Sequence, residues 1–291
     1  MADRSKKRRE DLSNVLFGFS DPLFTLSEQV KNIPIEDLYQ FKDHPFRVLD
    51  DEKMQETVES ILQHGVLVPG LARPREGGGY EIIAGHRRTR GAELAGKTEV
   101  PFLVRNYTDD EATIIMVDSN IQRENLLPSE KAFAYKMKND ALKHQGKKSD
   151  KSTYELVGDK AGDNAKTVQR YIRLTELYSG LLGMVDSNKL GIIVGVELSF
   201  LKKEEQLIVY ELLSKTGKKL TVEQAECLKR DSQDGKFDIA ILEGSTTSKK
   251  KSKGLKLKAK WRAEFFDDND SDEEIEKVIY ELLCQWKSNR G

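Results

Sequence analysis

Apolar residues in the first half of the chain switch repeatedly between the spacing of a strand and that of a helix. A helical spacing over residues 54–62 follows Asp50-Asp51 and ends at a glycine. Residues 66–73 and 80–84 have the composition of strands joined by a glycine-rich turn, and 99–105 reads as a further strand. We therefore predict a small α+β domain over residues 32–125.

Strand patterns are absent from the next hundred residues, which predicts an all-helical domain over residues 126–230. Ser129 is expected to cap a helix that runs to His144, and residues 152–177 to hold two short helices. Two more helices are expected to begin at capping boxes. One box pairs Thr108 with Glu111 in the α+β domain, and the other pairs Thr221 with Gln224 in the helical domain. Residues 231–253 read as a polar linker.

The last segment, residues 254–291, alternates apolar and charged residues over 255–265, as a half-buried strand does. A helix capped by Ser271 and Glu274 is expected to follow. Its apolar stripe consists of Ile275, Val278, Ile279, Leu282, Leu283 and Trp286. Because one strand and one helix cannot bury this stripe alone, we predict a dimerisation module covered by a second copy of the chain.

The charge of the chain is balanced in total but separated along its length. Lys and Arg number 48 against 49 Asp and Glu, yet seven lysines and no acid lie in residues 246–260. Eight acids follow in residues 264–276, and residues 1–31 form a polar, basic tail that we expect to be flexible. Blocks of opposite charge indicate separate surfaces with separate partners.

Several classes of protein are excluded by composition. No apolar run approaches the roughly 20 residues of a membrane span, and the basic N-terminus lacks the apolar core of a secretory signal. The two cysteines, Cys227 and Cys284, have neither the spacing of a zinc site nor that of a disulfide scaffold. These observations predict a cytoplasmic protein.

Residues 152–177 carry the strongest local signal for DNA binding. Gly158, Gly162 and Val168 have the spacing of a helix-turn-helix, in which a small residue, a turn glycine and a branched apolar residue lock two helices together. Tyr154, Leu156, Tyr171 and Ile172 would complete the core. The outward residues of the second helix suit base edges and phosphates, and they are Asn164, Lys166, Thr167, Gln169, Arg170 and Arg173. A generic helical hairpin with a solvated polar face is the alternative.

The sequence Gly85-His86-Arg87-Arg88-Thr89-Arg90 lies at a strand-to-helix transition. A new helix presents free N–H groups, and arginines supply forked donors that match phosphate oxygens, so we expect this loop to bind an anion. The residues alone leave open whether the anion is a nucleotide or the DNA backbone, and a structural cluster of ion pairs remains possible. Arg123, in the second polar cluster 120–125, could join the same site.

Together these motifs resemble the ParB family of partition proteins, and the resemblance covers roughly residues 32–230 in the same order. The ParB signature is Gly-Glu-Arg-Arg-x-Arg, then Glu-Asn-x-x-Arg, a helix-turn-helix and a dimerising tail. Here the corresponding segments are 85–90, 119–123, 152–177 and 255–286. The stretch His64-Gly65-Val66-Leu67-Val68-Pro69 is similar to the family's His-Gly-x-x-Gln-Pro strand.

The resemblance implies an N-terminal domain of the ParB and sulfiredoxin-like fold and a homodimer that binds a centromere-like site on double-stranded DNA. CTP with Mg²⁺ would switch it into a sliding clamp on the nucleoid, and a ParA-type ATPase would contact Arg8 or Arg9 of the basic tail. The residues implied for CTP are Gly85, His86, Arg87, Arg88, Arg90, Asn120 and Arg123. The implied metal ligands are Asn120 and Glu124.

Three positions depart from the family pattern, namely His86 and Ser119, where the family has Glu, and Val68, where it has Gln. Loss of a carboxylate at Ser119 places CTP hydrolysis in question more than CTP binding. Two other functions therefore stay open. The first is a helix-turn-helix transcriptional regulator with no CTP switch. The second is an enzyme like sulfiredoxin, although Ala84 stands where that chemistry needs a cysteine.

Overall fold

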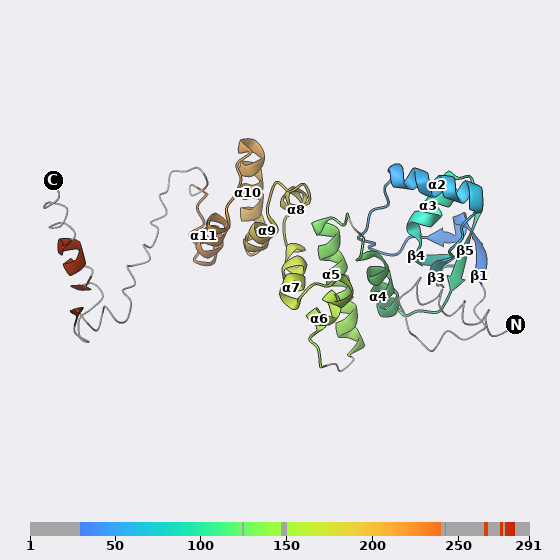
Figure 1. Cartoon of the computed structure of the whole chain (residues 1–291), viewed down its shortest axis with the longest axis horizontal. Coiled ribbons are helices and arrows are strands. Elements are labelled where there is room, and N and C mark those ends of the chain that lie inside the picture. Colours follow the sequence, from blue (N-terminus) through green and yellow to red (C-terminus); the bar gives the residue numbers. More distant parts are fainter. Residues whose placement is uncertain are drawn as a thin grey trace. The chain divides into compact units, whose positions relative to one another are not determined.

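The computed structural model describes residues 30–123, 125–146, 150–239, 242, 265–266, 274–275 and 277–282. The chain divides into a compact unit that reaches Asp238 and a second unit, Ile239–Gly291 (Figure 1). Among the residues described, none of the helices combines the length and apolar character that crossing a bilayer would need.

A mixed five-stranded sheet in the order β1-β5-β3-β4-β2 forms the base of the first unit. Its strands are β1 (Val30–Pro34), β2 (Leu38–Tyr39), β3 (Gly70–Pro74), β4 (Tyr80–Ala84) and β5 (Glu99–Val104), with a 3-10 turn, η1 (Ile35–Asp37), between the first two. β3 pairs antiparallel with β4 and parallel with β5, while β1 lies antiparallel to β5. The predicted hairpin is thus confirmed, although its first strand begins at Gly70 and not at residue 66.

Two apolar cores lie on opposite faces of this sheet. Ile82 packs with Ile61 of α2 (Glu52–His64) and Ala92 of α3 (His86–Leu94) on one face. The neighbouring Ile83 packs with Met116 of α4 (Asp109–Asn120) on the other. Figure 1 shows α2 and α3 together on one side of the sheet and α4 on the other. Because successive side chains of a strand point to opposite faces, one strand serves both cores.

Helices make up the rest of the first unit. They are α5 (Pro128–Gln145), α6 (Thr153–Gly158), the 3-10 turn η2 (Asp159–Ala161), α7 (Ala165–Leu174), α8 (Ser179–Asp186), α9 (Ile192–Leu198), α10 (Lys203–Thr216) and α11 (Val222–Gln233). Tyr135 of α5, Val157 of α6 and Val168 of α7 are buried in the same core as Met116. The helices α5, α6 and α7 therefore share a continuous core with one face of the sheet.

The helix starts test the local predictions directly. The capping boxes at Thr108 and Thr221 are confirmed, and they open α4 and α11. The expectation that Ser129 caps the next helix was wrong, because Pro128 takes the first helical position of α5. Proline suits that position since its missing N–H would have no partner within the helix. Ser129 instead bonds to Asp186 of α8.

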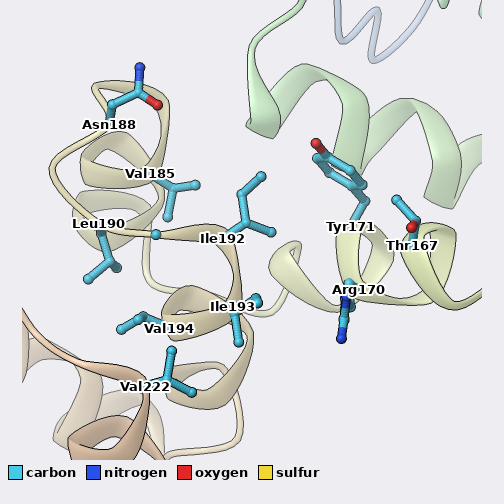
Figure 2. Close-up of a pocket in the computed structure, with 11 residues that line it drawn as sticks. Thr167, Arg170, Tyr171, Val185, Asn188, Leu190, Ile192, Ile193, Val194 and Val222 are labelled. Atoms are coloured by element: carbon cyan, nitrogen blue, oxygen red, sulfur yellow. The ribbon is translucent and has the colours of Figure 1, made fainter.

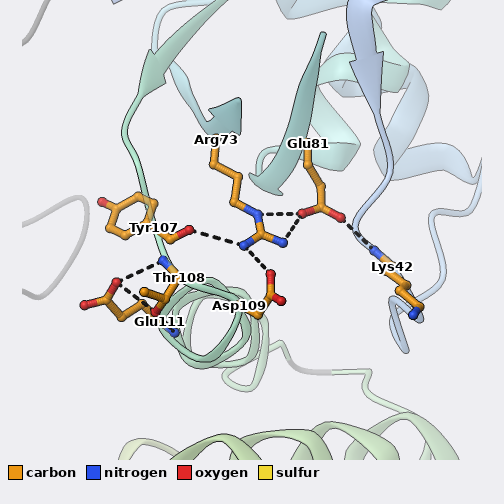
Figure 3. Close-up of polar contacts among 7 residues, drawn as sticks. All are labelled: Lys42, Arg73, Glu81, Tyr107, Thr108, Asp109 and Glu111. Atoms are coloured by element: carbon orange, nitrogen blue, oxygen red, sulfur yellow. Dashed lines mark hydrogen bonds and ion pairs between the residues drawn. The ribbon is translucent and has the colours of Figure 1, made fainter. Parts of the chain in front are cut away.

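A polar cluster centred on Arg73 fastens the sheet to α4 (Figure 3). The Arg73 guanidinium lies 2.6 Å from a carboxylate oxygen of Glu81 on β4 and 2.6 Å from one of Asp109, the first residue of α4. It also donates to the carbonyl oxygen of Tyr107, and Glu81 accepts a hydrogen bond from the backbone of Lys42. This cluster fixes the start of α4 relative to the hairpin.

In the second unit, residues 274–275 and 277–282 are helical, in the segment where the sequence predicts a helix. Ile275 is buried, whereas Val278 and Leu282 of the predicted stripe are exposed within the chain. Most of the predicted strand, together with Leu283 and Trp286, lies outside the described residues, so the dimerisation module stays a prediction.

Candidate functional site

The turn at Gly85 joins β4 directly to α3. Its φ of +113° is a conformation that residues with a Cβ rarely adopt, and a Cβ there would lie 3.1 Å from the Cα of Gly70 on β3. No side chain caps the start of α3. The first N–H groups of the helix are therefore left available at this turn, as the sequence predicted.

A cavity of about 500 Å³, which we call the arginine cavity, brings the two predicted motifs together. Arg87 reaches it from α3, and Arg123 reaches it from the segment after α4. Its other lining residues are Arg47, Leu49, Asp51, Lys53, Gln122, Asn125, Leu126, Leu127 and Glu130. Among the described residues of its wall, four cationic side chains thus face two carboxylates, which favours an anionic ligand.

The cations of this cavity influence one another. The Arg87 guanidinium lies 2.9 Å from a carboxylate oxygen of Asp51, and this bond holds the pKa of Asp51 below its ordinary value. Desolvation lowers the pKa of Arg123, as does the positive charge of Arg87, while Glu130 opposes that shift. An anion placed between the two arginines would relieve their repulsion.

The structure places Arg88 and Arg90 outside this cavity. The Arg88 guanidinium donates to the backbone carbonyls of Val68 and Pro69, at 2.6 and 2.8 Å, and burial lowers its pKa. It lines a separate cavity of about 340 Å³ between α2 and the loop before β3. Arg90 forms ion pairs with Asp50 and Glu93, of which Asp50 raises its pKa most. Arg88 therefore braces a loop, and Arg90 belongs to a surface ion-pair cluster.

His86 is buried against a second histidine. Its ring centroid lies 4.0 Å from that of His44, and burial lowers the pKa of His86 to about 3. His44 donates from Nδ1 to the carbonyl oxygen of Phe46, and burial lowers its pKa as well. The Nε2 atoms of both rings are buried without a hydrogen-bond partner. The side chain of His86, a residue implied for CTP binding, is thus a neutral imidazole that is buried next to the turn at Gly85.

The second motif begins with two side chains that bond to their own helix. Asn120 is buried, and its amide donates to the carbonyl oxygen of Met116 and to the hydroxyl of Ser119. Ser119 in turn donates to the Met116 carbonyl. Glu124, the carboxylate implied as a metal ligand, lies outside the described residues. Among the residues that are described, no group of three or more His, Cys, Asp or Glu could hold a metal ion.

The α6–α7 pair has the compact turn that the glycine spacing predicted. A Cβ on Gly158 would lie 2.1 Å from the carbonyl oxygen of Asp163, so only glycine allows this approach. Val168 is fully buried. Val157 is buried beside it, whereas Leu156, the expected core residue, is only half-buried. The expectation for Leu156 was therefore off by one residue along the helix.

The predicted outward residues of α7 have different surroundings. Asn164 caps the helix through the backbone N–H of Thr167, and the exposed residues are Asn164, Lys166 and Gln169, while Thr167 and Arg170 are half-buried. Arg173 is already engaged, since its guanidinium donates to the hydroxyl and carbonyl oxygens of Ser199, at 2.9 and 2.7 Å. It also stacks on Phe200.

A groove of about 600 Å³ runs beside α7 (Figure 2). Thr167 and Arg170 line one side of it, and Ile192 and Ile193 at the start of α9 line the other. Ile193 is 45% exposed. The groove therefore joins the half-buried Thr167 and Arg170 of α7 to a more apolar wall from α9.

Sequence reasoning missed four charged residues that line the arginine cavity, namely Arg47, Asp51, Lys53 and Glu130. None of them belongs to a motif with recognisable spacing. Asp51 carried a local signal as the cap of α2, but nothing in the sequence connected it with Arg87.

Comparison with known proteins agrees with the motif order. The family model for the ParB N-terminal domain matches residues 21–121. A probable chromosome 1-partitioning protein ParB of Deinococcus radiodurans is 36% identical over 203 residues, which cover 70% of this chain and 66% of that protein, about two thirds of its length. Stage 0 sporulation protein J of Bacillus subtilis is 32% identical, over 94% of this chain and 97% of its own.

Solved structures of a C-terminally truncated chromosome-partitioning ParB from Caulobacter crescentus are similar as well. Its complex with the centromeric parS site is 27% identical, with a TM-score of 0.43, and covers 69% of this chain and 99% of that one. Its complex with CTP-γ-S is 27% identical, with a TM-score of 0.31, and the match covers 64% of this chain and 99% of that one. With a relative matched over nearly its whole length, the chain belongs to the ParB family of chromosome-partitioning proteins.

Proposed function

We propose that this protein binds a centromere-like DNA site through the α6–α7 pair and is switched by CTP bound in the arginine cavity. The observation that carries the proposal is the meeting of Arg87 and Arg123, from two separate motifs, in one cationic cavity. Membership of the ParB family supports the same reading. Acting with a ParA-type ATPase on the nucleoid, such a protein would segregate DNA.

The DNA-binding part of the proposal rests on α7 as the reading helix. The exposed side chains of Lys166 and Gln169 and the edge position of Arg170 suit contacts with phosphates and base edges. Asn164 and Thr167 at the start of the helix are also assigned to this surface. Arg173, held by Ser199, is assigned to orienting α7, in addition to any phosphate that it reaches.

The nucleotide-binding part of the proposal rests on the positive charge of the arginine cavity and on the backbone N–H groups at the start of α3. Arg87, Arg123, Arg47 and Lys53, which line the arginine cavity, would neutralise a triphosphate. Gly85 does not line this cavity, but its turn begins the helix that carries Arg87, and the first N–H groups of α3 would bind any phosphate that reaches them. Arg88 would act indirectly, because it holds the Val68–Pro69 loop in place. His86 and Asn120 do not line the arginine cavity, so these buried residues would act by supporting the turn and the helix that carry Arg87 and Arg123.

A protein-held Mg²⁺ does not fit the described donors. Mg²⁺ is usually bound through one or two carboxylates together with substrate phosphates. The described carboxylates of the arginine cavity already have partners, since Asp51 is paired with Arg87 and Glu130 accepts from the backbone N–H groups of Arg47 and Leu127. The described residues therefore do not support a metal held by the protein, and the assignment of Glu124 remains a prediction from the resemblance.

Two further parts of the proposal concern segments that lie wholly or mostly outside the described residues. The ParA-type ATPase is assigned to Arg8 or Arg9 in the basic tail, and dimerisation is assigned to the C-terminal module. Both assignments rest on charge and apolar pattern together with family membership. Cross-linking of the full chain through a cysteine placed in the C-terminal stripe would report the dimer.

Replacing Arg123 with alanine is expected to weaken CTP binding on the order of tenfold to a hundredfold, because a hydrogen bond to a charged group contributes about 1.5–3 kcal/mol. Isothermal titration of the full chain with CTP measures this. Arg90→Ala is the comparison, because its side chain lies in the surface ion-pair cluster, and its CTP affinity should stay near that of the wild type. A large loss in the Arg90 variant with none in the Arg123 variant would contradict the assignment of the cavity.

Replacing Arg170 with alanine is expected to lower affinity for the specific DNA site by roughly 5- to 150-fold, because a good base contact is worth about 1–3 kcal/mol. CTP affinity should not change, since Arg170 does not line the arginine cavity. Fluorescence anisotropy at several salt concentrations measures the effect, and Lys215→Ala on the exposed side of α10 is the matched loss of one cation. Equal DNA affinity in both variants would mean that α7 does not read the site.

A specific observation also supports a second function, a DNA-binding regulator with no nucleotide switch. Arg87 already pairs with Asp51, and Arg90 with Asp50 and Glu93, so the protein's own carboxylates satisfy part of the arginine loop. The CTP titration separates the two functions. Specific DNA binding without any CTP binding would favour the regulator.

A further inference from the structure

The turn between α6 and α7 places a carboxylate directly in front of the helix proposed to read DNA. Asp163 precedes Asn164, the residue that caps α7 through the backbone N–H of Thr167. The backbone N–H of Asp163 donates to the carbonyl oxygen of Gly158, at 3.1 Å, so the contact between the two helices fixes its place. Its side chain is 20% exposed and therefore remains in contact with solvent.

An unpaired carboxylate at this place would oppose DNA binding. In a helix-turn-helix, the N-terminal residues of the second helix contact base edges, and the first N–H groups of a helix attract phosphates. The first turn of α7, which is described in full, contains no acidic residue, and Lys166 is exposed there. A free negative charge on Asp163 would therefore repel the phosphates that α7 has to approach.

Two donors on α5 hold the carboxylate of Asp163. The Nζ of Lys131 lies 2.6 Å from its Oδ2, and the hydroxyl of Tyr135 donates to the same oxygen. Tyr135 is fully buried, and burial, together with its bond to Asp163, raises its pKa, so the hydroxyl keeps its proton. A neutral hydroxyl fixes the position of Oδ2 but leaves its charge. Neutralisation of Asp163 therefore depends on Lys131.

Two aromatic rings hold the ammonium group of Lys131 in turn. Its Nζ lies 4.9 Å from the ring centroid of Tyr171 on α7 and 5.5 Å from that of Tyr135, within the range of a cation–π interaction. The two rings meet edge to face, with their centroids 5.9 Å apart. The cation is thus fixed in place, unlike the flexible lysines of most surface ion pairs.

We propose that Lys131 is a positioning residue for DNA binding that acts through Asp163. By neutralising this carboxylate and holding it against α5, Lys131 lets the start of α7 approach DNA phosphates. The inference rests on the proposed function and adds to it a residue outside the helix-turn-helix. Lys131 does not need to contact DNA for this role.

The test measures the affinity of the full chain for a fluorescent duplex that carries the site selected by the wild type from random-sequence DNA. Lys131→Met should weaken binding by about 5- to 10-fold, the effect of one unpaired charge a few ångströms from a phosphate. This deficit should shrink as the salt concentration rises from about 0.01 M to 0.15 M, because the Debye length falls from about 30 Å to about 8 Å.

Three further variants separate neutralisation from other roles of Lys131. Asp163→Asn removes the charge and keeps an acceptor for Tyr135, so it should bind DNA at least as well as the wild type. The double variant Lys131→Met with Asp163→Asn should return to the wild-type affinity, because both charges are gone. Lys131→Arg keeps the cation and should also bind as the wild type does.

The matched control is Lys136→Met, which removes another cation of α5. The partner of Lys136 is Glu176, 3.5 Å away and beyond the C-terminal end of α7. A carboxylate left unpaired there is remote from the start of the reading helix. DNA affinity of this variant should stay within about twofold of the wild type, as for an ordinary surface substitution.

Each outcome bears on the inference separately from the proposed function. A loss of affinity in Asp163→Asn as large as that in Lys131→Met would mean that the pair only braces the turn, and would overturn the inference. A double variant as weak as Lys131→Met would overturn it too, because Lys131 would then contact DNA itself. Both results leave DNA binding by α7 standing. A wild-type chain that selects no site would remove the proposed function and the inference together. If Lys131→Met fails to fold, Asp163→Asn alone decides between the roles.

Discussion

Replacing Gly158 with alanine is expected to lower the free energy of unfolding by about 3 kcal/mol and to abolish binding to the specific DNA site. The added Cβ would lie 2.1 Å from the carbonyl oxygen of Asp163 and 3.0 Å from Cγ2 of Val168. Neither contact is the free end of a flexible side chain, so α6 and α7 must move apart. The gain in helix propensity from alanine, about 1 kcal/mol, does not offset this.

Denaturation in urea and DNase footprinting measure the two effects of this substitution. Gly183→Ala is the matched control, because Gly183 also lies in a helix of this part of the chain and a Cβ there meets nothing within 4 Å. That variant should be as stable as the wild type or slightly more stable. A Gly158→Ala protein with wild-type stability and a normal footprint would show that α6 and α7 do not need this close contact.

Local signals in the sequence predicted most of the elements. A capping box acts within four residues, and the spacing of apolar residues in a helix acts within about two turns, so both can be read without knowing the fold. The boxes at Thr108 and Thr221 and the strand over residues 80–84 were predicted for this reason. The prediction that Ser129 caps a helix was wrong because Pro128 takes the first position of the same helix.

The candidate site was predictable only in part. The glycine turn at Gly85 and the meeting of Arg87 with Arg123 followed from motifs, and the structure brings these two arginines to one cavity. The sequence did not predict where the Arg88 side chain lies. Its partners are backbone carbonyls of a loop, and backbone carbonyls have no sequence signature. Glu130 was missed for a similar reason, since its bond to the backbone of Arg47 spans two different parts of the chain.

The buried ion pair between Lys138 and Asp118 gives the prediction with the largest effect. The Nζ of Lys138 lies 2.5 Å from Asp118 on α4, and the two side chains are 4% and 11% exposed. Lys138 also donates to the carbonyl oxygen of Val157 on α6. The pair therefore joins three helices: α4, which precedes Arg123 of the arginine cavity, α5, and α6, which packs against α7, the helix proposed to read DNA.

Asp118→Asn is expected to lower the free energy of unfolding by about 3–5 kcal/mol, because it leaves the buried Lys138 ammonium without its counter-charge. Denaturation in urea measures this. The control is the double variant Asp118→Leu with Lys138→Met, which removes both charges and should stay within about 1–2 kcal/mol of the wild type. A stable Asp118→Asn protein would instead mean that water reaches Lys138, so that α4 and α5 separate readily in solution.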